Sequence, residues 1–262
     1  MTIQGNPTQT AEPNISGAAK FELTEAIATK VLSVVDKGLS SGTGNRKPGE
    51  MSVEAAVCYA LGLPHGDDPG CVAPALRTLK IRLNDSNWSS EAARARGLRR
   101  LAIAQLGSKD HLDEKEFRRR VVDYALRVSV PSALRSAASI HKDEKHKAAL
   151  CEAANRCEKE ASRQAAIDAR EVARAAAAAY VGYAAYADAA DAATYAAYAA
   201  YATTAADAVY AAAYAAYAAA AAAAAARKSA RDKSLADYAE AVVQILIDMK
   251  APGCQFLSLT EA

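Results

Sequence analysis

The residues best suited to chemistry are arginines gathered on either side of the one tryptophan. From Arg77 to Arg135 the chain carries fourteen basic residues against seven acidic ones, although its overall formal charge is only +2. A guanidinium binds phosphate through paired hydrogen bonds, and an indole ring can stack on a nucleobase. We therefore predict an anionic, nucleotide-type ligand here, although Trp88 would equally suit a gap between two helices. The residues expected to contact this ligand are Arg77, Lys80, Trp88, Arg94, Arg96 and Arg99.

A glycine- and proline-rich turn, LGLPHGDDPG, forms the second candidate site. It places His65 close to Asp67 and Asp68, immediately before an expected helix, and such turns fix the backbone in defined positions. Histidine and aspartate together suit acid–base catalysis, so a hydrolase using His65 and Asp67 is one alternative. The other is that an aspartate simply caps the helix that follows. No further ligand lies at a spacing typical of a metal site, so we expect no metal.

The segment YAAYAAYATTAADAV is one copy of an internal repeat with a period of fifteen residues. Alanine favours helix strongly, and a continuous helix over 175–226 would be about 78 Å long. The small alanines would let a neighbouring helix approach closely, while the tyrosines supply the buried area. Rings such as Tyr198 and Tyr201 are therefore expected either to pack in a seam or to stack on the predicted ligand.

Several classes of protein are disfavoured by what the sequence omits. It contains no GxxxxGK[ST], GxSxG, HExxH or CxxC motif, so we expect no cofactor and favour a protein that is not an enzyme. Five cysteines without a disulfide-like spacing and an N-terminus without a secretion signal predict a cytoplasmic location. Residues 208–226 are uncharged and long enough to span a bilayer, but alanine is only weakly apolar, so we expect no membrane insertion.

Helical signals recur along the chain and strand signals are nearly absent, which predicts an all-α fold. Pro131 is expected to break the chain, and His141 and His146 are expected to be solvated within a charged helix. Helices are expected over Phe21–Lys37, after Ser52, over Cys71–Leu83, from Ser89 or Ser90 to about Leu106, after Asp113, and after Ser234.

These signals divide the chain into consecutive parts of one cooperative unit. They are a disordered lead-in over 1–19, a basic helical part with the glycine–proline loop over 20–131, an alanine-rich part ending in an amphipathic helix over 132–250, and a tail over 251–262. The expected architecture is an elongated helical bundle with one long alanine–tyrosine helix.

Two stretches resemble known groups of proteins. The segment from EAAVCYALGLPHGDDPGC to LRRLAIAQLGS, together with VVQILIDMKAPGC, is similar to uncharacterised proteins of bacteria and their phages. The AAYAAYA part resembles helical bacterial proteins described as immunity proteins. Neither group brings catalytic residues to this chain. The resemblance implies a role in conflict between bacteria, or between bacteria and phage, where proteins commonly act by sequestering something.

We therefore expect a non-enzymatic helical protein that sequesters an anionic, nucleotide-type small molecule, for instance as a phage-encoded antagonist of host defence. A second hypothesis is a protein-interaction or immunity module whose alanine–tyrosine helix forms the seam of a homo-oligomer. The hydrolase is the third. Direct binding of nucleic acid by the basic half is a further, less favoured alternative.

Overall fold

The computed structural model describes residues 22–179, 191 and 230–261. Within these residues the fold is all-α, as predicted, and no strand forms beyond an isolated bridge between Gly44 and Met51. None of the described helices is long and apolar enough to cross a membrane. The elements are α1 (Glu25–Val35), α2 (Val53–Ala60), α3 (Pro74–Asn84), α4 (Glu91–Ala104), α5 (Glu114–Tyr124), the π-helix η1 (Ala125–Ser129), α6 (Val130–Ile140), α7 (Glu144–Glu160), α8 (Arg163–Ala179), α11 (Arg231–Asp248) and the 3-10 helix η3 (Pro252–Thr260).

Local signals set most of the helix ends. The side chains of Ser52 and Ser90 each accept the backbone N–H three residues ahead, at 3.1 Å, and so cap α2 and α4. Asp113 caps α5 by accepting the N–H groups two and three residues ahead, both at 3.0 Å. Gly62 and Gly107, with φ of 73° and 70°, follow α2 and α4 in the left-handed conformation that glycine adopts readily.

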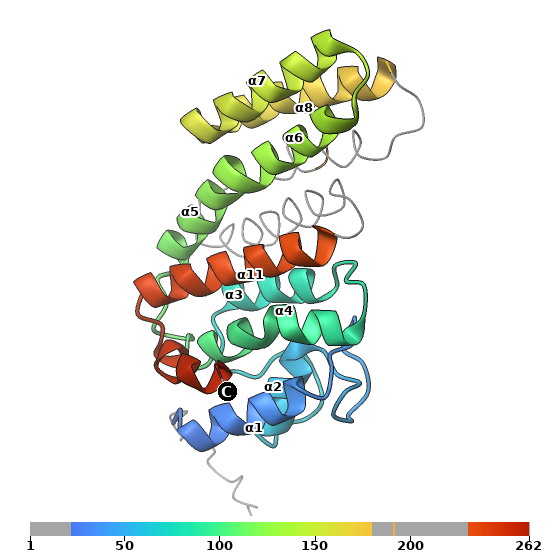
Figure 1. Cartoon of the computed structure of the whole chain (residues 1–262). Helices are drawn as coiled ribbons and strands as arrows, with labels where there is room; N and C mark the ends of the chain where they lie inside the picture. The colour runs from blue at the N-terminus through green and yellow to red at the C-terminus, as the bar shows by residue number, and fades with distance from the viewer. Residues whose placement is uncertain (1–21, 180–190, 192–229, 262) are drawn as a thin grey trace, which may run out of the picture.

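Helices α1 to α4, α11 and η3 form one layered body, which we call the basal helices (Figure 1). Helix α4 contacts α1, α2, α11 and η3, and it buries Leu98 and Leu101 completely. Gly97 allows the Trp88 ring to approach α4 closely, because a Cβ atom added there would lie 2.3 Å from Trp88 Cη2. The indole is therefore packed directly against the α4 backbone.

A long helical rod connects the basal helices to the rest of the described chain (Figure 1). Helix α5 continues through the π-helix η1 into α6 without a break. The prediction that Pro131 breaks the chain is thus wrong. Proline in an α-helix lacks a donor and clashes with the carbonyl four residues back. The wider π turn directly before Pro131 relieves that clash by adding a residue to the turn, so the rod continues.

Helices α6, α7 and α8 pack against one another to form what we call the α6–α8 arm. Its contacts are made largely through alanines, and Ala133, Ala154, Ala166 and Ala173 are completely buried. The chain turns between α6 and α7 at residue 141 and between α7 and α8 at residue 161. His141 lies in the first turn and is buried, not solvated as predicted, and its Nδ1 accepts the backbone N–H of Asp143 at 3.1 Å.

Helix α11 begins earlier than the sequence suggests. Ser234 was expected to cap it, but its hydroxyl donates to the carbonyl of Ala230 at 3.1 Å from within the first turn. The predicted apolar face is confirmed, since Leu235, Tyr238 and Leu246 are buried. The alanine–tyrosine repeat, including Tyr198 and Tyr201, lies outside the described residues apart from Asp191.

Candidate functional site

Lys80, a predicted ligand contact, lies entirely inside the basal helices. Its ammonium nitrogen is 2.8 Å from Oε1 of Glu54, and neither side chain has any exposed area. Burial lowers the pKa of Lys80 and raises the pKa of Glu54, while the attraction between the two charges opposes both shifts. Lys80 is therefore placed to balance Glu54, and its ammonium does not reach the surface.

Trp88 and Arg94 are also internal. The indole N–H of Trp88 donates to the carbonyl of Leu83 at 2.9 Å, so the ring fills the gap between α3 and α4. Arg94 donates from Nε to the carbonyl of Asn84 at 2.7 Å and from Nη1 to that of Leu39 at 2.9 Å. Burial lowers the pKa of Arg94. These contacts hold the loop after α1 and the end of α3 against α4.

The remaining predicted arginines are nearer the surface. Arg77 pairs with Asp68 and lowers the pKa of that carboxyl through a side-chain hydrogen bond. Arg99 holds both carboxylate oxygens of Asp36, at 2.7 and 3.1 Å. Arg96 and Arg99 line a common pocket of about 270 Å³ beside the end of α1, together with Lys37 and the carboxylates of Asp36 and Glu91. The structure therefore brings two of the predicted contacts together in a pocket of mixed charge, where Asp36 already occupies Arg99.

The loop containing His65 acts as a structural bridge. The ring nitrogen Nε2 lies 3.0 Å from the carbonyl of Gly44, joining this loop to the one before α2. Asp68 accepts the backbone N–H of Gly70 at 3.1 Å, and Asp67 is exposed. Among the described residues no group of histidine, cysteine and carboxylate side chains could hold a metal ion. A hydrolytic role for His65 and Asp67 stays a prediction.

A different set of residues makes the groove that we regard as the candidate site. It has a volume of about 480 Å³ and lies where η1 and α6 meet α7. We call it the arginine–serine groove. Its lining residues are Arg127, Val128, Ser132, Arg135, Ser136, Ser139 and Glu158.

The π-helix and α6 bring these side chains to one face. Ser132, Ser136 and Ser139 are spaced by four and three residues, so they follow one side of α6. The wider turn of η1 places Arg127 and Val128 on the wall of the same groove. Val128 is 43% exposed, unusual for a large apolar side chain in the described part of this chain. π-Helical turns occur frequently at functional sites.

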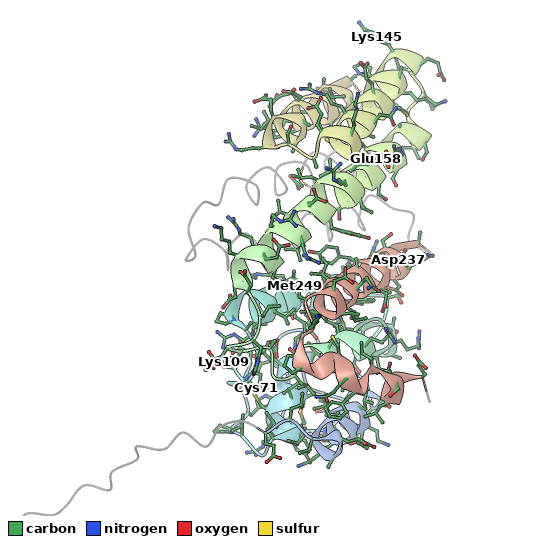
Figure 2. All side chains as sticks on the ribbon, turned by 90° about the vertical axis from the view of Figure 1, so that its left-hand side faces the viewer. Cys71, Lys109, Lys145, Glu158, Asp237 and Met249 are labelled. Carbon is green, nitrogen blue, oxygen red and sulfur yellow. The ribbon has the colours of Figure 1, made fainter. Side chains whose placement is uncertain are left out.

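Both arginines are held in place by α7. Arg127 donates from Nη1 to the carbonyls of Glu158 and Lys159, at 2.7 and 3.2 Å, and so satisfies acceptors at the end of that helix. Arg135 donates from Nη2 to Asn155 at 2.9 Å and to the carboxylate of Glu158 at 2.5 Å. Glu158 comes from α7 and lies beside α6 (Figure 2). Arg127 also donates from Nε to both carboxylate oxygens of Asp123, at 3.0 and 3.1 Å. Each of the two fixed cations is therefore already paired with a carboxylate, and of these carboxylates Glu158 lines the groove.

The sequence prediction missed this groove for an identifiable reason. Arg127 and Arg135 were counted in the basic half, but an expected break at Pro131 assigned them to separate elements. The serine spacing from Ser132 to Ser139 in PSALRSAAS was the available signal. It marks a polar stripe beside Arg135 on a helix whose opposite face is alanine and leucine.

Comparisons with family models, with curated proteins and with solved structures found no match to this chain.

Proposed function

We propose that this protein is a non-enzymatic helical binding protein that takes an anionic, nucleotide-type small molecule in the arginine–serine groove. The observation that carries the proposal is the convergence of Arg127 and Arg135 with three serine side chains on one wall. Guanidinium groups and hydroxyls are typical phosphate donors, and a volume of about 480 Å³ lies within the range of small-molecule sites. Val128 supplies an apolar surface for a ring beside them.

The charge of Glu158 leads to a specific expectation for the affinity of the groove for anions. Its carboxylate accepts a hydrogen bond from Arg135, and its charge faces the space that a phosphate would enter. An incoming phosphate must displace this carboxylate or lie close to it, and like charges repel. Removing the charge of Glu158 should therefore strengthen anion binding, whereas removing that of Arg135 should weaken it.

Calorimetry with ATP and with pyrophosphate tests this directly. We expect Arg135→Gln to weaken binding of both probes by at least tenfold, and Glu158→Gln to strengthen it severalfold. Arg156→Gln is the matched control, because Arg156 is an exposed arginine of α7 that does not line the groove. Equal affinity for the wild type and Arg135→Gln, or equal losses in Arg135→Gln and Arg156→Gln, would reject the groove as the site.

The biological setting that we propose is sequestration of a nucleotide-derived signal in the cytoplasm, in conflict between bacteria and phage. It rests on the sequence resemblance and on the lack of catalytic motifs in the sequence. Native mass spectrometry of protein purified from bacteria, before and after denaturation, measures any retained ligand. Extra mass in the nucleotide range, lost on denaturation, supports sequestration.

A second candidate function is a protein-interaction module in an elongated bundle, with the fifteen-residue repeat as a homo-oligomeric seam. The regular tyrosine spacing in an alanine background favours it. Replacing Tyr198, Tyr201 and Tyr214 with alanine should then reduce the mass of the assembly in solution. An unchanged native mass would reject this seam.

A further inference from the structure

A second polar pocket lies within the basal helices and shares no lining residue with the arginine–serine groove. It has a volume of about 70 Å³ and is walled by the loops before and after α2, the start of α2 and the end of α3. Three carboxyl side chains line it, those of Glu54, Asp67 and Asp85, and no lysine or arginine does. We call it the acidic pocket.

Glu54 is ion-paired with Lys80 and still lacks hydrogen-bond donors. Its Oε1 lies 2.8 Å from Nζ of Lys80, and both carboxylate oxygens are buried without a hydrogen bond within the described residues. A buried carboxylate oxygen without a donor costs free energy, because it has lost its hydrogen bonds to water. Because Glu54 lines the acidic pocket, a donor located there would remove this cost.

The rest of the wall is rigid and offers mainly acceptors. Asn84 is fully committed, since its oxygen accepts the N–H of Val53 at 3.3 Å and its amide donates to Ser40 and Asp85 at 3.0 and 2.9 Å. Asp85 also accepts the N–H of Gly42 at 2.7 Å. These bonds fix both loop and helix around the pocket.

Because the wall offers carboxylates and other acceptors, it favours a small cation that donates hydrogen bonds. A protonated primary amine carries three N–H donors on a compact charge. The volume of about 70 Å³ accommodates such a group, since one water needs only about 10–15 Å³ by this measure. A metal ion is disfavoured, because no described group of side chains could hold one.

We propose that the acidic pocket binds the protonated primary amine of a small molecule, with Glu54 Oε2 as its buried acceptor and Asp67 at the exposed edge. This site is independent of the anion groove, and it would give the protein a second ligand of opposite charge. The inference therefore stands or falls separately from the proposed function.

Amide NMR titration with methylammonium at constant ionic strength is the test. We expect saturable shifts at Thr43, Val53 and Asp67 in the wild type. The double variant Glu54→Gln, Lys80→Met removes the buried charges together and should keep the fold but lose the saturable shifts. Asp67→Asn should weaken binding roughly fivefold, and Asp68→Asn is the matched control, because Asp68 does not line the pocket.

The competing outcomes are distinct. Absence of saturable shifts in the wild type overturns the proposal, as does equal weakening by Asp67→Asn and Asp68→Asn. Tetramethylammonium has the same charge and no N–H, so equivalent shifts with this probe would show that charge alone is responsible. Shifts with Mg²⁺ but not with methylammonium would assign the pocket to a metal instead.

Discussion

The basal helices and the α6–α8 arm handle charge in opposite ways. In the basal helices, charged groups lie inside the core, as Glu54, Lys80 and Arg94 do. In the arm, the buried positions are mostly alanine and the charges stay outside, where Arg135 and Arg156 make ion pairs on the surface. One region uses internal charge to fix its geometry, and the other keeps its charged groups on the surface.

This difference indicates which arginines are candidates for a functional site. Arg94 is buried and donates to backbone carbonyls, so it holds helix ends together. Arg127 also donates to backbone carbonyls, but it lines the groove, as Arg135 does. Residue type alone would assign all three to one role, and the burial of Arg94 separates it from the other two.

Removing the buried cation should give the largest effect. Lys80→Met leaves Glu54 charged and unpaired inside the core, and breaking a buried pair costs about 3–5 kcal/mol. Urea unfolding measures this loss. Adding Glu54→Gln to Lys80→Met should restore much of the lost free energy of unfolding. Arg156→Met in the arm should scarcely move the urea midpoint, because the ion pairs of Arg156 are exposed. Similar losses in Lys80→Met and Arg156→Met would abolish the contrast between the two regions.

A smaller effect is expected where the Trp88 ring packs against Gly97 of α4. Gly97→Ala places a methyl group 2.3 Å from Trp88, and overpacking typically costs about 1–3 kcal/mol, reduced here by the better helix propensity of alanine. Thermal and urea unfolding would detect it. Gly66→Ala is the control, because nothing lies within 4 Å of the added atom and its backbone is unstrained. If both variants unfold alike, the indole is not packed as described.

The smallest effect concerns the rod between the two regions. Hydrogen bonds from Arg119 and then Arg120 lower the pKa of Glu116 from 4.5 to about 2. The stabilising contribution of Glu116 is therefore complete above its unfolded pKa of about 4.5 and is lost as pH falls through about 2. Carbon-detected NMR should follow this titration. Arg119→Gln with Arg120→Gln should return the midpoint towards 4.5, whereas a wild-type midpoint already near 4.5 contradicts the pairing.

Local chemistry made much of the fold predictable from sequence. The caps at Ser52, Ser90 and Asp113 and the apolar face of α11 depend on residues a few positions apart, so the sequence contains all the partners. The all-α class follows from the same signals. The continuity at Pro131 was not predictable in this way, because it depends on a π turn that the propensity of single residues does not encode.

The burial of Lys80 was harder to predict, although the spacing of its apolar neighbours indicated it. Lys80 occupies a place in the apolar stripe of α3, with Leu76, Leu79 and Leu83 at helical spacing around it. Charged residues are mostly exposed, so a lysine is expected to lie on the surface unless there is evidence to the contrary. The partner of Lys80, Glu54, lies on a separate helix, α2. Residue spacing can indicate that a charge faces inward, but the identity of its partner requires the tertiary fold.

The π turn in the rod also determines how a change in chain length affects everything beyond it. A π turn holds one residue more than an α turn, so loss of a single codon within 125–129, with return to regular α-helix, would leave the α6–α8 arm at nearly the same angle about the rod. Loss of a codon from the regular α-helix of α5 would instead turn the arm by about 100°. Single-residue deletions should therefore change the direction of the arm far less in 125–129 than in α5.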